Sequence, residues 1–340
     1  MSPARERPVV AVETAARESR TLRDLMRHAV TRFEAAGLAY GHGTDNAWDE
    51  AAVLLLWALH LPPERLEPFL DARISKAERH AALALVEERM RARVPAAYLT
   101  GEAWLRGLSF ACDARALVPR SLLAEALEEA LPAWLECHGH AASWPAGVLD
   151  LCTGGGSLAI LAALHFPDAR VSAADLSEDA LALAAENLAR HGLEERIALH
   201  RGDLFAAVAG QRFDLVLCNP PYVNEESMRR LPPEFRAEPR AALAGGADGM
   251  DLVRRVLAQA PAHLSRDGVL VLEIGHEARH FEAAFPSLEF HYLPVTAGER
   301  MVVLVEAAQL GTGTADGTAA TPQLASRPGG RARRRRSRAA

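Results

Sequence analysis

A strand, a glycine turn and a helix follow one another in Leu149-Asp-Leu-Cys-Thr-Gly-Gly-Gly-Ser157 and the Leu158-Ala-Ile-Leu-Ala-Ala-Leu164 after it. Three consecutive glycines let the backbone approach a ligand closely, because no Cβ stands in the way. The turn lies at the carboxyl end of the strand, where open α/β sheets bind nucleotide-like ligands. The GxGxxG spacing of dinucleotide-binding turns is not met. We therefore expect a nucleotide-like ligand here, with Asp150 either orienting the loop or meeting an amino group of the ligand.

Short apolar runs separated by helical segments continue beyond this turn. Such spacing predicts right-handed crossovers and a parallel sheet covered by helices on both faces. Two later runs, 288–293 and 301–305, flank a turn-rich segment and predict an antiparallel terminal hairpin. The expected fold is therefore α/β, with a doubly wound sheet. The expected parallel strands are residues 148–152, 170–174, 197–200, 214–218 and 269–273.

The pattern before this sheet is helical. Apolar residues between Leu22 and Phe33 recur on one helix face, and 51–59 and 81–90 read similarly. Asp45 or Asn46 is placed to cap the helix that follows. These features predict a small helical bundle. The expected divisions are a disordered N-terminus (1–18), a helical domain (19–97), a linking hairpin (98–120), the α/β domain (121–306) and a disordered arginine-rich tail (307–340).

Two acidic residues follow the next two expected strands. Asp175 lies 21 residues after Gly154 and could accept hydrogen bonds from both hydroxyls of a ribose. Asp203 could accept from an adenine amino group, with Leu204 or Phe205 against the ring. A helix-capping acid is the alternative interpretation of Asp203.

The fourth expected strand ends in Asn219-Pro-Pro-Tyr222. The carboxamide oxygen of Asn219 and the carbonyl of Pro220 could accept the two N–H groups of a planar amide or aromatic amine. The prolines fix the direction of these acceptors, and Tyr222 could stack on the planar group. A proline-rich turn that merely ends a strand is the alternative, but the position after the fourth strand favours catalysis.

Charge and composition exclude several classes of protein. No charge-free apolar stretch reaches the roughly 20 residues of a membrane span, and the N-terminus lacks the apolar core of a secretory signal; we expect a cytoplasmic protein. Four widely spaced cysteines predict no metal site, and Cys152 and Cys218 are expected to be packing residues.

The net charge of −6 conceals an asymmetry. After residue 306, seven arginines against Asp316 give +6, so residues 1–306 carry −12. The tail could contact RNA phosphates, although a dispensable solvated tail explains the composition equally well. The arginines are Arg327, Arg331, Arg333, Arg334, Arg335, Arg336 and Arg338.

The glycine motif, the two acids and Asn219 to Tyr222 together resemble the HemK/PrmB-type glutamine methyltransferases over roughly residues 20–306. The resemblance implies a class I, Rossmann-like methyltransferase fold and S-adenosylmethionine as cofactor. It implies that Asn219, Pro220 and Tyr222 are catalytic and that the helical domain helps to recognise a protein substrate. The cofactor-binding residues it implies are Asp150, Thr153, Gly154, Gly155, Gly156, Asp175, Asp203, Leu204 and Asn219.

Other stretches resemble the branch of this family that methylates the third protein of the large ribosomal subunit. They include residues 40–50, 97–100, 117–121, the version of the glycine motif with Cys152, and 238–239 with 245–249. This resemblance implies that ribosomal protein as substrate. The rivals are a release-factor glutamine methyltransferase, a nucleic-acid adenine methyltransferase and a ribosome-assembly factor that works by binding alone. The acidic balance of residues 1–306 argues against a DNA enzyme.

Overall fold

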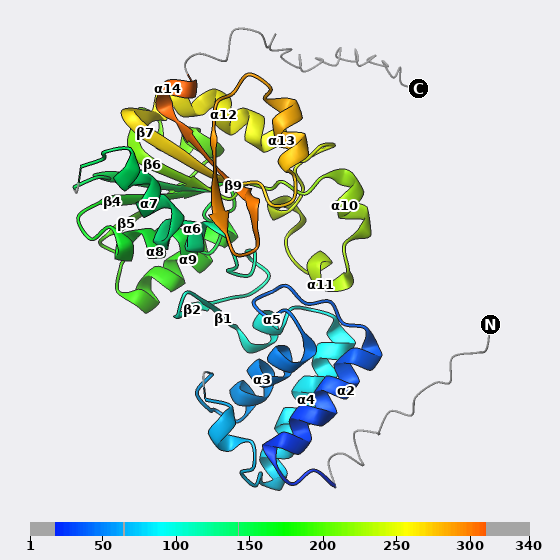
Figure 1. Cartoon of the computed structure of the whole chain (residues 1–340). Helices are drawn as coiled ribbons and strands as arrows, with labels where there is room; N and C mark the ends of the chain where they lie inside the picture. The colour runs from blue at the N-terminus through cyan, green and yellow to red at the C-terminus, as the bar shows by residue number, and fades with distance from the viewer. Residues whose placement is uncertain (1–17, 64, 142, 311–340) are drawn as a thin grey trace, which may run out of the picture.

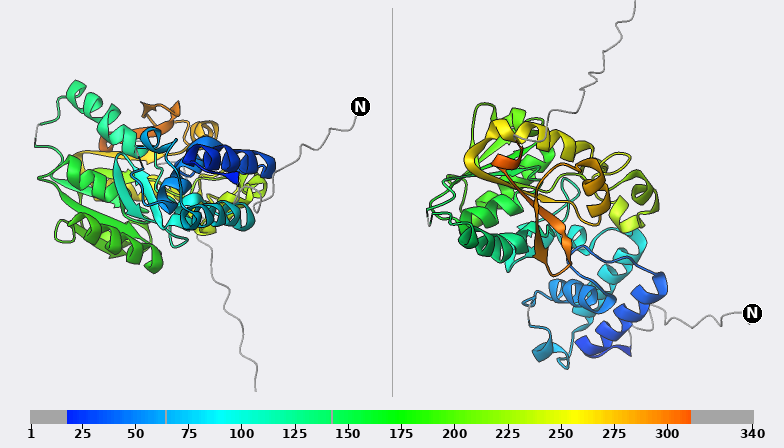
Figure 2. Two further views of the ribbon diagram at one scale, coloured as in Figure 1. Left: turned by 90° about the horizontal axis from the view of Figure 1, so that it is seen from below. Right: turned by 45° about the horizontal axis from the view of Figure 1, so that its top comes forward.

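The computed structural model describes residues 18–310, apart from residues 64 and 142 (Figure 1). A helical N-terminal part lies at one end of an α/β part, and the second view of Figure 2 separates the two clearly. Throughout residues 18–63, 65–141 and 143–310, no helix is long and apolar enough to span a membrane.

The N-terminal part is the expected bundle. Leu22, Leu25, Met26 and Phe33 face its core together with apolar residues of the next two helices. Asn46 caps α3, because its side chain accepts from the Asp49 N–H at 3.0 Å. The helices are α2 (Leu22–Ala36), α3 (Ala47–Ala58), η1 (Glu67–Phe69), α4 (Lys76–Ala92) and α5 (Ala96–Thr100).

A hairpin of β1 (Glu102–Leu105) and β2 (Leu108–Ala111) leads into the α/β part. This hairpin was predicted, although α5 runs a few residues past the expected boundary at 97.

A seven-stranded sheet in the order β5-β4-β3-β6-β7-β9-β8 forms the α/β part. The first five strands are parallel, and β9 and β8 are antiparallel, as predicted. The strands are β3 (Gly147–Leu151), β4 (Arg170–Asp175), β5 (Ile197–Arg201), β6 (Phe213–Cys218), β7 (Leu264–Glu273), β8 (His291–Val295) and β9 (Gly298–Glu306).

Helices cover both faces of this sheet (Figure 1). Alternate residues of the central strands belong to two separate apolar clusters, one on each face. Helices of the first face are α6 (Leu123–Glu128), α7 (Ala130–Cys137), α8 (Ser157–His165) and α9 (Glu178–His191). Those of the second face are η2 (Leu204–Val208), α12 (Asp251–His263), α13 (Ala278–Ala284) and α14 (Ala307–Leu310).

Three short helices follow β6: α10 (Glu225–Arg230), α11 (Pro233–Arg236) and η3 (Arg240–Ala242). Figure 1 shows α11 facing the N-terminal helices. Glu234 of α11 is fully buried and pairs with Arg93 at 2.8 Å, while Arg89 lies 3.5 Å away. The segment after β6 thus joins the two parts of the molecule.

The expected start of the tail at residue 307 is wrong. Residues 307–310 form α14, and Leu310 is buried in the second apolar cluster. Burial against the sheet, which local composition does not reveal, extends the ordered part. The expectations for residues 1–17 and for the arginine-rich segment beyond 310 lie outside the described residues.

Candidate active site

A cavity of about 490 Å³ opens at the carboxyl ends of the parallel strands. It lies where the chain order reverses between β3 and β6, which is the ligand-binding position of open α/β sheets. Four loops that follow strands contribute to its lining: residues 151–155, 174–177, 202–204 and 219–223.

The glycine turn presents its backbone to the cavity. Gly154 and Gly155 line the cavity, whereas Gly156 is the N-cap of α8. Gly154 and Gly156 have φ values of +55° and +82°, which disfavour side chains. A Cβ on Gly156 would lie 3.1 Å from the Cβ of Ala184, so this glycine also lets α9 pack closely.

Asp150 orients this turn from beneath it. Its side chain is fully buried, does not line the cavity, and accepts from Thr153 Oγ1 at 2.5 Å and the Ala159 N–H at 3.0 Å. Burial raises the pKa of Asp150 to about 7. Thr153 lines the cavity, so Asp150 affects the cavity wall through its hydrogen bond with Thr153 rather than by direct exposure.

Asp175 lies at the end of β4 beside the glycine turn. Its carboxylate accepts from the Gly154 N–H at 2.9 Å and the Ser177 N–H at 2.8 Å, one on each oxygen. Each oxygen keeps a free lone pair, and the residue lines the cavity. The predicted juxtaposition of glycine turn and acid is present.

Asp203 and Leu204 also line the cavity, but Phe205 faces the core, where its ring stacks on His263. The Asp203 side chain makes no capping hydrogen bond to η2. It pairs instead with Arg255 at 2.6 Å, and that arginine lines the cavity as well. The capping interpretation of Asp203 is therefore wrong.

The Asn219-Pro-Pro-Tyr222 turn opens onto the same cavity, and all four residues line it. Within the described part of the chain, the carboxamide of Asn219 makes no hydrogen bond to protein. The Tyr222 hydroxyl donates to Glu273 Oε1 at 2.9 Å. Cys218, directly before the turn, is fully buried, and burial raises the pKa of its thiol well above the usual range.

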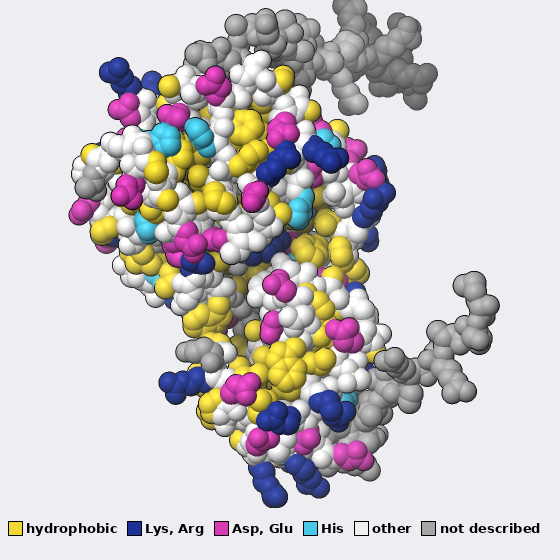
Figure 3. All heavy atoms as spheres, in the orientation of Figure 1, with side chains coloured by type: hydrophobic (Ala, Val, Ile, Leu, Met, Phe, Trp, Pro, Cys, Tyr) yellow, Lys and Arg dark blue, Asp and Glu magenta, His cyan; other side chains and the backbone are white. Residues whose placement is uncertain are grey.

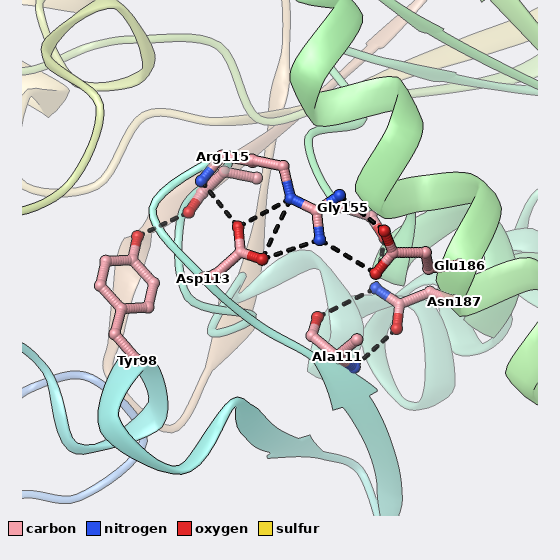
Figure 4. Close-up of polar contacts among 8 residues, drawn as sticks. Tyr98, Ala111, Asp113, Arg115, Gly155, Glu186 and Asn187 are labelled. Atoms are coloured by element: carbon pink, nitrogen blue, oxygen red, sulfur yellow. Dashed lines mark hydrogen bonds and ion pairs between the residues drawn. The ribbon is translucent and has the colours of Figure 1, made fainter.

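One wall of the cavity was not predicted. Residues 115–121, between the hairpin and α6, line it, and Ala116 lies beside Gly154 of the glycine turn. Figure 4 shows how α9 holds the start of this segment: Asn187 contacts both Ala111 and Gly155, and Glu186 pairs with Arg115.

Asn187 links the glycine turn to the end of β2, which leads into this wall. It is fully buried, accepts from the Ala111 N–H at 2.6 Å, and donates to the carbonyls of Ala111 at 3.2 Å and Gly155 at 2.9 Å. The sequence holds a signal for it. Asn187 falls on the apolar stripe of α9 with Ala180, Leu183, Ala184 and Leu188, where a polar residue needs buried partners.

Glu238 holds the other end of this wall. Its carboxylate accepts from the Val118 N–H at 3.0 Å and from both terminal nitrogens of Arg120 at 2.5 and 2.6 Å, and His42 of the helical part lies 3.2 Å away. Burial opposes ionisation, but the hydrogen bonds from His42 and Arg120 outweigh it and lower the pKa of Glu238 to about 2. Arg120 lines the cavity, so both parts of the molecule shape the site.

Two family models match the chain. Residues 135–247 match the methyltransferase small domain, and residues 24–101 match the PrmC N-terminal domain. The chain is also similar to a solved methyltransferase from Pyrococcus furiosus, with 16% identity and a TM-score of 0.42, over 60% of this chain and 90% of that one.

The chain aligns with curated relatives over nearly the whole length of those relatives. The ribosomal protein uL3 glutamine methyltransferase of Bordetella pertussis is 56% identical over 87% of this chain and 98% of its own. The protein of the same name from Burkholderia pseudomallei is 54% identical over 86% of this chain and 96% of its own. The chain therefore belongs to the family of ribosomal protein uL3 glutamine methyltransferases.

Proposed function

We propose that this chain transfers a methyl group from S-adenosylmethionine to the side-chain amide nitrogen of a glutamine in ribosomal protein uL3. One observation carries the proposal: in a chain 56% identical to a uL3 glutamine methyltransferase, Asn219 to Tyr222 opens onto the same cavity as the glycine turn and Asp175. The cofactor half and the acceptor half of a methyl-transfer site are thus adjacent.

The cavity suits S-adenosylmethionine. Gly154 and Gly155 line it, Asp175 has lone pairs for ribose hydroxyls, and Leu176 and Leu204 offer apolar contact to a base. Asp203 pairs with Arg255 through Oδ2, so its Oδ1 can accept from the base amino group. When bound, this cofactor supplies an electrophilic methyl group on a sulfonium centre.

Asn219 and Pro220 then orient the acceptor. A glutamine amide is a poor nucleophile because its nitrogen lone pair is delocalised into the carbonyl. The Asn219 carboxamide oxygen accepts one N–H and the Pro220 carbonyl the other, which directs the nitrogen toward the methyl group. No strong base is needed, because the nitrogen becomes acidic as it bonds to carbon.

The reaction takes place in the cytoplasm, where ribosomal proteins are made. Contact between the arginine-rich segment beyond residue 310 and ribosomal RNA remains a separate proposal, supported by its seven arginines. In Figure 3, basic and acidic side chains are interspersed on the face shown.

The test is methyl transfer from labelled S-adenosylmethionine by the full-length chain into lysate of a strain that lacks its gene. Labelled proteins are separated and the modified residue is mapped by mass spectrometry. Label on a glutamine of uL3 supports the proposal. Label on release factors or on nucleic acid, with none on uL3, overturns it.

A further inference from the structure

Glu273 lines the cavity although nothing in the glycine turn or the Asn-Pro-Pro-Tyr turn points to it. It is the last residue of β7, the neighbour of β6 in the sheet, and its side chain is almost fully buried. A carboxylate in such a position needs hydrogen-bond donors, and these donors show what it holds in place.

The two oxygens of Glu273 have different partners. Oε2 accepts from Ser121 Oγ at 2.5 Å and from the Leu122 N–H at 2.9 Å, both at the start of α6. Oε1 accepts from the hydroxyl of Tyr222 at 2.9 Å. Two donors therefore fix the carboxylate by one oxygen, and the other oxygen is directed at the tyrosine of the Asn-Pro-Pro-Tyr turn.

The ring of Tyr222 is also held along its edge. A Cβ on Gly275 would lie 2.6 Å from Cε2 of this ring and 3.1 Å from its hydroxyl oxygen, so only glycine leaves room for it. The backbone here is fixed in turn, because the N–H groups of Ile274 and Gly275 both donate to the Met301 carbonyl of β9. Residues 273–275 thus hold Tyr222 at its hydroxyl and along one edge of its ring.

We propose that Glu273 is a positioning residue for Tyr222: by holding the hydroxyl, it fixes the ring as the face against which the planar amide of the acceptor glutamine lies. This inference rests on the proposed function. It also gives the Tyr222 hydroxyl a role that does not involve contact with the substrate. Alignment of the acceptor amide then depends on a residue outside the turn that binds it.

A double-mutant cycle separates this role from a purely structural one. Tyr222→Phe removes only the hydroxyl, and Glu273→Gln removes the charge while keeping the shape. We expect each single variant to lower kcat roughly tenfold or more, with the Kd of S-adenosylmethionine changed less than about twofold. Because both act through one hydrogen bond, the double variant should be no slower than the slower single variant.

The chain offers a matched control. Tyr292 donates to Glu282 at 3.0 Å in an exposed pair. Tyr292→Phe and Glu282→Gln make the same chemical changes away from the cavity and should leave kcat unchanged.

Two results would overturn the inference: Tyr222→Phe with wild-type kcat, or multiplicative losses in the double variant. The first holds even if Glu273→Gln fails to fold. Wild-type labelling of uL3 tests the proposed function separately, and the cycle is run on whichever acceptor the wild type methylates.

Discussion

The surroundings of two buried carboxylates near the cavity, Glu238 and Asp150, shift their pKa values in opposite directions. The hydrogen bonds that Glu238 accepts, including those from an arginine, outweigh its burial and lower its pKa. Asp150 accepts from only a hydroxyl and one backbone N–H, so burial dominates and raises its pKa. One oxygen of Asp150 has no hydrogen-bond partner in the described structure. Glu238 is thus held as a charged carboxylate by its partners, whereas a charge on Asp150 costs free energy at its buried position.

Asn219 gives the sharpest prediction at this scale. Asn219→Ala removes an acceptor for the substrate amide but leaves the glycine turn and Asp175 intact. We expect transfer to fall by about 100-fold or more while the Kd of S-adenosylmethionine stays nearly unchanged. Single-turnover rates and calorimetric binding measure the two quantities; an equal loss of both would contradict the assigned role.

Asp150 predicts a pH dependence of stability. Because its folded pKa of about 7 exceeds the ordinary 3.8, its contribution is fully present below pH 3.8 and is lost as the pH rises through 7. Asp150→Asn does not titrate, so its free energy of unfolding relative to wild type should rise by up to about 4 kcal/mol between about pH 4 and about pH 8. Urea unfolding at both pH values measures this difference, and a constant difference would refute the prediction.

At the scale of elements, α9 is more than a covering helix. Through Asn187 it joins the glycine turn to the end of β2, and through Glu186 it holds Arg115 of the cavity wall (Figure 4). The geometry of the cavity beside the glycine turn thus depends on α9, although not all side chains of this helix line the cavity.

Replacing Asn187 should therefore loosen that half of the site. Asn187→Leu leaves two buried carbonyls and one N–H without partners, so we expect the free energy of unfolding to fall by about 2–4 kcal/mol and cofactor affinity to fall with it. The control is Glu178→Gln on the same helix, which loses only an exposed pair with Arg201. Unfolding and binding titrations provide the readout; unchanged cofactor affinity in Asn187→Leu would contradict the prediction.

The sequence predicted what local pattern encodes. The five parallel strands, the terminal hairpin and the loops carrying Asp175 and Asn219 follow from apolar runs and turn residues. The wall at 115–121 could not be predicted, because contacts with Glu186 and Glu238, distant in sequence, hold it. For Asp150 the sequence left two roles open, and the choice of the loop-orienting role depends on burial that no local pattern reports.

At the scale of the whole molecule, buried ion pairs join the helical part to the segment after β6. Glu50 and Glu234, one from each part, flank the fully buried Arg89 at 2.5 and 3.5 Å. Glu238 then connects His42 to Arg120 in the cavity wall. Docking of the helical part and the shape of the site are thus physically connected.

Glu234→Gln tests this junction. It removes the carboxylate paired with Arg93 and leaves Glu50 as the only carboxylate of the described residues beside the buried Arg89, so the junction keeps one unbalanced positive charge. We therefore expect a loss of about 3 kcal/mol in the free energy of unfolding. Denaturant unfolding should show a separate early transition of the helical part. Glu87→Gln, which breaks a partly exposed pair with Arg32, should cost less than about 1 kcal/mol. Equal losses of unfolding free energy in the two variants would show that the junction stabilises the protein no more than a partly exposed ion pair does.

If this cavity methylates a glutamine of uL3, peptide mass mapping of purified, unmodified uL3 after incubation with the full-length chain and S-adenosylmethionine detects the product itself. We expect one added methyl group on a single glutamine side chain, and none when the Asn219→Ala variant replaces the wild type. Unmodified uL3, or a methyl group on a residue other than glutamine, would contradict it.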